Sequence, residues 1–243
     1  MFLRSFAAHF YRVLAILLSG RLRYMFSQLG HRRFSQGSAL REVLFVFGEL
    51  SDSDIDWMIA TGRLVKIPAD TVLIHEGRPV DGLYILLDGT MTVFVSEEEH
   101  NPLTLAFAAL EDGKTSGREI ARLFRGDIVG EMPFVDDYPP ATTVKAREDS
   151  LVLIIPRQQL VVKLQQDVVF TSHFYRVMAI LLSDRLLKIA SQLGYGRRVY
   201  SEEQELDEAI EYEDELDPHI LDHVSLAGAR FDWMLRRLRV KSA

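Results

Sequence analysis

The chain has 243 residues, 48% of them hydrophobic, which is enough to bury one core of ordinary size and to carry helical extensions. It contains no cysteine, which excludes disulfides, thiolate metal sites and a cysteine nucleophile, and favours a cytoplasmic protein. The net charge of −7, without a concentrated basic patch, argues against nucleic acid as a partner.

Residues 1–36 are predicted to form an N-terminal amphipathic helix, because apolar residues recur three or four positions apart. His9 and Arg12 lie against its short apolar run and no small-residue cleavage site follows, so a signal peptide is not expected. No stretch is long enough to predict a transmembrane segment. We expect the helix to pack in a core or a dimer. The alternative is peripheral binding to a membrane through its basic, apolar face.

The sequence of this helix occurs twice. Two blocks within residues 6–30 recur within residues 170–194, at a constant offset of 164 residues. Shared apolar periodicity does not account for identical polar residues such as His9 and His173, so we interpret the segments as a duplication. We expect both histidines to serve as capping or interface residues rather than as catalysts.

Residues 38–64 are predicted to form helices that lead into a β domain, with serines and aspartates after Leu50 offering N-caps. After Pro68 the pattern changes to short, closely spaced strands separated by glycines, without long helices between them. This pattern indicates a sandwich or barrel over residues 65–156. The expected strands begin at Thr71, Leu83, Met91, Leu103, Thr142 and Leu151.

Residues 157–194 are predicted to form the helices after the barrel, and they contain the second copy of the repeat. Residues 200–243 begin with an acidic linker and end in a basic amphipathic helix around Phe231. We interpret this last helix as a docking peptide for a partner protein. Folding back onto the chain's own basic surface and a solvated tail are the alternatives.

Signals for other chemistries are weak. His219 and His223 lie one helical turn apart with Asp222 beside them, as in some zinc sites, but no third ligand is indicated and a solvated helix face explains the spacing equally well. The chain has no nucleophile elbow, no phosphate-binding loop and no dinucleotide fingerprint. We therefore expect neither a metal site nor an enzyme.

Four motifs in order carry a family resemblance: residues 47–55, 74–93, 126–131 and 170–176. They resemble the cyclic nucleotide-binding domain of catabolite-activator-type regulators, protein kinase A regulatory subunits and nucleotide-gated channels. The resemblance implies an α+β fold, with a jelly-roll β-barrel and flanking α-helices. The chain after residue 194 is too short and too acidic for the helix-turn-helix domain of catabolite activators, so DNA binding is not expected.

In that family a phosphate-binding cassette holds the cyclic nucleotide, and here it maps onto residues 129–144 without a gap. The resemblance implies that the glycine lets the backbone approach the ligand and that the glutamate accepts a ribose hydroxyl. It also implies that helix-start amides and an arginine bind the phosphate. The candidate binding residues are Gly130, Glu131, Met132, Ala141 and Thr142.

Two prolines stand where the cassette needs donors. The family's arginine position is Pro140, which has neither charge nor N–H, and a helix-start amide position is Pro133. A charge-assisted hydrogen bond is worth about 1.5–3 kcal/mol, so losing one together with an amide donor weakens binding by about two orders of magnitude or more. Asp136 and Asp137 add negative charge beside the place where an anion would lie.

We therefore predict a regulatory or interaction protein with a degenerate phosphate site, which acts through an unidentified partner protein and through a homodimer formed by the post-barrel helix. No cofactor is assigned, and cAMP and cGMP are the candidate ligands. One alternative is a functional cAMP or cGMP receptor in which Lys145 or Arg147 replaces the arginine, and another is a site for a ligand other than a cyclic mononucleotide. The others are a structural assembly subunit and a ligand-gated transcription regulator that works through a partner.

Overall fold

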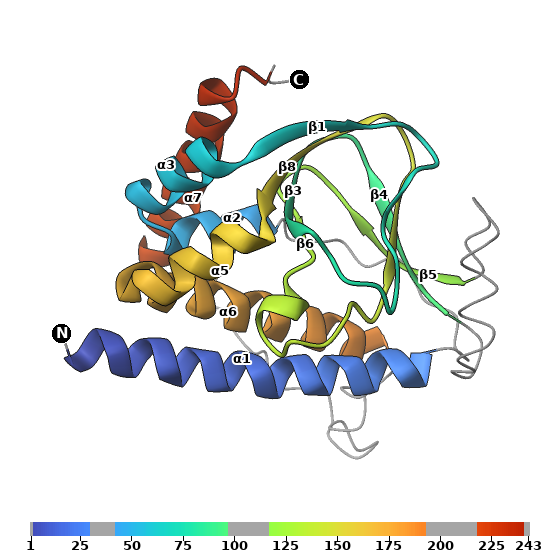
Figure 1. The fold of residues 1–243 in the computed structure, drawn as a ribbon, viewed down its shortest axis with the longest axis horizontal. Coiled ribbons are helices and arrows are strands. Elements are labelled where there is room, and N and C mark those ends of the chain that lie inside the picture. The colour runs from blue at the N-terminus through green and yellow to red at the C-terminus, as the bar shows by residue number, and fades with distance from the viewer. Residues whose placement is uncertain (1, 30–41, 97–116, 193–217, 241–243) are drawn as a thin grey trace, which may run out of the picture.

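The computed structural model describes residues 2–29, 42–96, 117–192 and 218–240 (Figure 1). Two antiparallel four-stranded sheets form the β domain, and helices gather at one end of it, so the fold is α+β as predicted. None of the helices described is long and apolar enough to cross a membrane.

The first sheet has the strand order β1-β8-β3-β6 and the second has the order β2-β7-β4-β5. The first consists of β1 (Arg63–Ile67), β8 (Ser150–Pro156), β3 (Gly82–Asp88) and β6 (Ile128–Val129). The second consists of β2 (Val72–Ile74), β7 (Thr143–Ala146), β4 (Met91–Val95) and β5 (Arg118–Leu123).

Strand β3 separates two apolar cores. Its side chains alternate between the two faces of the sheet, as the geometry of a strand requires. Leu83 and Ile85 face the core that the sheet shares with the helices, whereas Tyr84 and Leu86 face the space between the two sheets. One cluster therefore fills the space between the two sheets, and the other packs the β domain against the helices.

Helices α2 (Glu42–Glu49) and α3 (Asp52–Thr61) lead into the β domain. Ser51 and Asp54 form a capping box at the start of α3, in which each side chain accepts a hydrogen bond from the other's backbone N–H. Helix α3 ends at Thr61 and β1 begins at Arg63, within the segment 38–64 that was expected to lead into the β domain. The predicted strand at Leu103 lies outside the described residues.

After the β domain the chain forms α5 (Arg157–Gln166) and α6 (Val168–Gln192), which meet at Asp167. Helix α1 (Phe2–Leu29), the first copy of the repeat, lies along α6 and runs in the same direction (Figure 1). The post-barrel helix, which was predicted to form a homodimer, is thus already paired with a helix of its own chain.

The last helix, α7 (Pro218–Arg237), packs against α2 and α3. The Phe231 ring meets the Phe47 ring edge-on with centroids 5.1 Å apart, and Met234 is fully buried. Arg230 adds an ion pair to Asp52 at 2.8 Å. The interpretation of this helix as a docking peptide is therefore wrong, because its apolar face is buried within the chain.

Candidate nucleotide-binding cassette

The cassette begins where β6 ends. Gly130 adopts a positive φ of 79°, and a side chain there would come within 2.8 Å of the Tyr84 ring. Only glycine fits this turn, which brings the backbone back over the sheet. A short 3-10 helix, η1 (Met132–Phe134), follows directly, and the remaining loop of the cassette leads into β7.

Glu131, the residue expected to bind a ribose hydroxyl, is buried and ion-paired. The guanidinium of Arg185 on α6 donates to its carboxylate at 2.6 Å, and another nitrogen of the same group donates to the carbonyl of Ile128. Arg185 thus ties the start of the cassette to the post-barrel helix.

A second arginine holds the other half of the cassette. Arg23 on α1 donates to both carboxylate oxygens of Asp136, at 2.7 and 2.9 Å, and to the Pro139 carbonyl at 2.6 Å. The hydroxyl of Ser19 also donates to Asp136. The negative charge of Asp136 is therefore neutralised, and α1 is bound to the cassette loop through it. Asp137 is exposed, 3.9 Å from the Arg157 guanidinium.

The two prolines occupy places that suit them structurally. Pro133 lies in the first turn of η1, where the missing N–H costs little. Pro140 is buried, and its carbonyl accepts a hydrogen bond from the Gly77 N–H at 2.9 Å. Ala141 and Thr142, which were also assigned to the site, are partly exposed beside it, while Met132 is buried at the start of η1.

The two cations considered as replacements for the arginine are directed elsewhere. On β7, Val144 and Ala146 face the space between the sheets, so Lys145 points to the other side and pairs with Asp70 at 2.9 Å. Arg147 is exposed beyond the end of the strand. The alternative in which Lys145 or Arg147 enters the pocket is not what the structure shows.

The space between the sheets is apolar near the cassette. Tyr84 lies against Gly130 and donates its hydroxyl hydrogen to Asp81. Burial, reinforced by the hydrogen bond to Asp81, raises the pKa of Tyr84 well above its ordinary value, so the phenol stays neutral. Its buried apolar neighbours are Ile67, Ile74, Val80, Leu86, Met91, Val93, Leu123, Val129, Val144, Ala146, Val152 and Ile154.

The histidines singled out in the sequence have different positions. His173 on α6 lies 2.7 Å from the Asp54 carboxylate on α3, so it is an interface residue, while His9 lies 2.7 Å from the Ser5 carbonyl within α1. The side chains of His219 and His223 lie outside the described residues. Among the residues described, no group of three or more His, Asp or Glu could hold a metal ion.

Sequence reasoning missed both arginines of the site. Arg185 had a usable signal, because it matches Arg21 in the repeat and is one of the few identical charged residues. Arg23 had none, since it corresponds to Leu187 in the second copy.

Comparison with known proteins identifies the type of domain that contains this glycine turn and short helix. Residues 64–167 match the sequence model of the cyclic nucleotide-binding domain. The chain is 23% identical over 87 residues to the "cAMP-activated global transcriptional regulator CRP" of Salmonella typhimurium, covering 36% of this chain and 34% of the relative. It is 28% identical over 61 residues to the protein of the same name from Pasteurella multocida, covering 25% and 29%. The matches thus span about a third of these curated relatives.

A cyclic nucleotide-binding domain from Methylobacillus flagellatus has the same fold, with a TM-score of 0.50 and 19% identity over 66% of this chain and 84% of that one. The two sheets, the glycine turn and the short helix after it occur within the matched segment. Residues 64–167 are therefore a cyclic nucleotide-binding domain, and the chain is distantly similar to the CRP regulators.

Proposed function

We propose that this protein is a regulatory or interaction module, not an enzyme, whose cassette ties the β domain to α1 and α6 instead of binding a cyclic nucleotide. The observation that carries the proposal is Pro140 at the arginine position of the cassette, buried and without charge or N–H.

The free energies of the ion pairs make it unfavourable for a nearby arginine to bind the phosphate instead. Arg185 and Arg23 each neutralise a buried or nearly buried carboxylate, on Glu131 and Asp136 respectively. Removing the partner of a buried charge costs about 3–5 kcal/mol, whereas a charge-assisted hydrogen bond to the phosphate returns about 1.5–3 kcal/mol. The exchange is unfavourable, so neither arginine is expected to leave its carboxylate for the phosphate.

The same ion pairs hold the β domain, α1 and α6 together. With the cassette fixed to α1 and α6, the helices stay in one arrangement without a ligand, and the domain serves assembly with a partner protein. A homodimer through α6 requires a face that α1 now covers, so α1 has to leave before such a dimer forms.

Isothermal titration with cAMP and cGMP tests the proposal. The relatives named above are described as cAMP-activated, so cAMP is the first ligand to test. The unmodified chain is expected to bind neither nucleotide more tightly than about 0.1 mM, whereas Pro140→Arg restores the cation and should tighten binding about tenfold or more. Pro140→Ala removes the proline without adding charge and is the matched control. Micromolar binding by the unmodified chain would establish the receptor alternative.

A further inference from the structure

Helices α1 and α6 are related by an approximate two-fold axis. The Arg12 guanidinium lies 5.8 Å from the Tyr175 ring centre, and the Arg176 guanidinium lies 5.9 Å from the Tyr11 ring centre. These contacts are the same contact with the roles exchanged, because Tyr11 and Arg12 are the repeat counterparts of Tyr175 and Arg176. Such reciprocity is the mark of a two-fold interface, here formed within one chain.

The aromatic side chains repeat the same geometry in two different environments. The Phe6 and Phe10 rings stack at 6.3 Å and 18°, and their counterparts Phe170 and Phe174 stack at 6.1 Å and 24°. Phe174 is 1% exposed, however, and Phe10 is 54% exposed. The Phe6 and Phe10 rings therefore stack as the buried rings on α6 do, but they are exposed to solvent.

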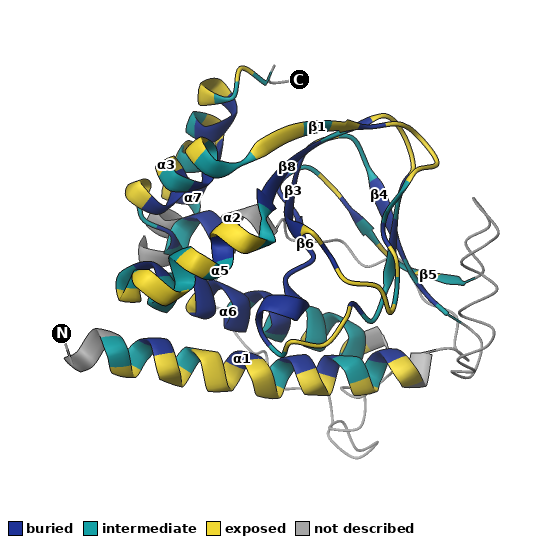
Figure 2. Ribbon diagram, in the orientation of Figure 1, coloured by how far each residue is buried: buried dark blue, intermediate teal, exposed yellow. Residues whose placement is uncertain are grey.

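This exposure continues along the helix. We call Phe6, Phe10, Val13 and Leu17 the outer stripe of α1; Figure 2 shows exposed residues along this helix. Leu17 is 63% exposed, whereas its counterpart Leu181 is 2% exposed, and all four counterparts are buried in the core between the helices and the β domain. An exposed apolar stripe of this length indicates an interaction surface.

Three basic residues border the outer stripe of α1. Their counterparts on α6 each contact a carboxylate. On α6, His173 lies 2.7 Å from Asp54, Arg176 is 3.0 Å from Glu49 and Arg185 is 2.6 Å from Glu131. Their counterparts on α1 are His9, Arg12 and Arg21, which are all exposed.

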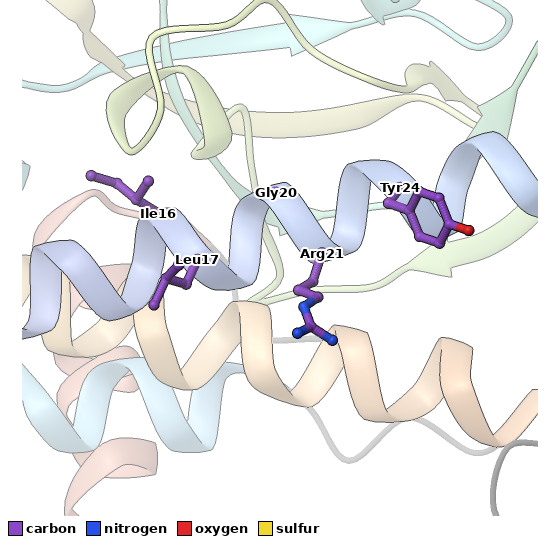
Figure 3. A pocket seen from close by; sticks show the side chains of 5 residues that line it. All are labelled: Ile16, Leu17, Gly20, Arg21 and Tyr24. Atoms are coloured by element: carbon purple, nitrogen blue, oxygen red, sulfur yellow. The ribbon is translucent and has the colours of Figure 1, made fainter.

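Arg21 lies beside a shallow groove lined by Ile16, Leu17, Gly20 and Tyr24 (Figure 3). Helix α1 contains no acidic residue, so two α1 stripes packed together would bring only bases face to face. A matching surface has to be apolar with carboxylates around it.

We propose that the outer stripe of α1 binds a second barrel of the cyclic nucleotide-binding type, as α6 binds the barrel of this chain. The partner surface is the groove that a post-barrel helix normally fills, bordered by carboxylates at the positions of Asp54, Glu49 and Glu131. The two-fold relation of α1 and α6 places that barrel on the far side of α1. The inference rests on the repeat and holds whether or not the cassette binds a nucleotide.

A tandem fusion tests this surface. Residues 38–164 of the same chain are joined directly ahead of residue 1, which keeps the register of the repeat and gives α1 the place after the added barrel that α6 has after the original one. Because the chain has no cysteine, Leu17→Cys reports on the stripe through its rate of maleimide labelling, and Leu226→Cys, 43% exposed on α7, is the control.

The labelling rate at position 17 is expected to fall at least about tenfold in the fusion relative to the unfused chain, with no change at position 226. Arg21→Glu, which sets a like charge against Glu131 of the added barrel, should restore fast labelling in the fusion. Unchanged labelling at position 17 would overturn the proposal. So would proteolytic removal of the added barrel as an unfolded segment, because α1 would then not provide the surface that α6 provides.

Two measurements on the unfused chain test other occupants. A mass of two copies by light scattering, with position 17 protected, would show that a second copy binds the stripe. Sedimentation with phosphatidylserine vesicles, with position 17 protected, would show a membrane surface. Either result would overturn the proposal, which predicts one copy in solution, no vesicle binding and fast labelling.

Discussion

Two carboxylates of the cassette are paired with arginines from the flanking helices. Glu131 and Asp136 would leave buried negative charge if they were not paired, and Arg185 and Arg23 come from α6 and α1 to neutralise them. The ion pairs are therefore coupled to the positions of both helices. Substituting either arginine is therefore expected to lower the free energy of unfolding.

Arg23→Met is expected to lower the free energy of unfolding by about 2 kcal/mol or more, because Asp136 loses its partner in a mostly buried place. The value lies below the full cost of a buried pair because the Arg23 side chain is 21% exposed. Urea denaturation measures the difference. The control is Arg21→Met on the exposed side of the same helix, which should change stability by less than about 0.5 kcal/mol. Equal effects of the two substitutions would contradict the assignment.

Asp167, between α5 and α6, makes the stability of the protein depend on pH. A hydrogen bond from Lys163, followed by the backbone N–H of Phe170, lowers the pKa of Asp167. A lowered folded-state pKa adds stability above the unfolded value of about 3.9, and this contribution is lost as the pH falls through the folded-state value.

Asp167→Asn should therefore destabilise the chain at neutral pH, and its difference from the unmodified chain should shrink as the pH falls below about 4. Denaturant titrations across this range measure the difference. A difference that stays constant with pH would show that the carboxylate charge is not what matters.

The position of each cassette residue could be predicted, but its partners could not. Gly130, Glu131 and the two prolines belong to one continuous motif, which a sequence pattern can identify. Arg185 and Arg23 lie 54 and 113 residues away from their partners, and only the folded chain brings them together. Local pattern carries no information on such a pair.

At the scale of elements, the same sequence is packed in two ways. The stripe on α6 is covered by the β domain and helices, while the outer stripe of α1 is open. Neither helix could be assigned a packing partner from its periodicity, because the two have the same pattern. The β domain and α5 precede α6 in the chain, and the residues of α6 lie in the core shared with that domain.

Phe174→Ala and Phe10→Ala form a matched pair of substitutions. Phe174→Ala is expected to cost about 3–5 kcal/mol, because it opens a cavity in the main core. Phe10→Ala should cost less than about 1 kcal/mol in the single chain, because the ring is half exposed. Thermal denaturation of both variants measures the contrast. Similar losses would mean that the outer stripe of α1 is covered in solution.

The sequence pattern did not predict strands β1, β5 and β6, which all lie at the edges of their sheets. Strands β1 and β5 carry charged residues such as Lys66 and Arg118, so they lack the apolar runs that predicted the others. Strand β6 has only two residues, too few for a pattern to be recognised. The last helix was identified from its amphipathic pattern, but the pattern does not say whether a partner or the chain itself covers the apolar face. Here α2 covers it.

At the scale of the whole molecule, α1 occupies the side of α6 on which a second copy of α6 could pack. Deleting residues 1–36 exposes that side while leaving the β domain linked to α6. Because α6 pairs with a near-copy of itself in this chain, the shortened chain is expected to dimerise. Light scattering should give a mass of two copies for it and of one copy for the full chain. A shortened chain that stays folded and has the mass of one copy would contradict this expectation.

We expect the cassette to connect the β domain to α1 and α6 without holding a cyclic phosphate. Nitrogen–proton correlation spectra of the full chain test this expectation through the backbone amides of Gly130 and Glu131, which belong to the segment predicted to bind the ligand. We predict that neither amide signal moves in a saturable way as cAMP or cGMP is added up to about 0.1 mM. Saturable shifts of both signals at micromolar nucleotide would contradict the account.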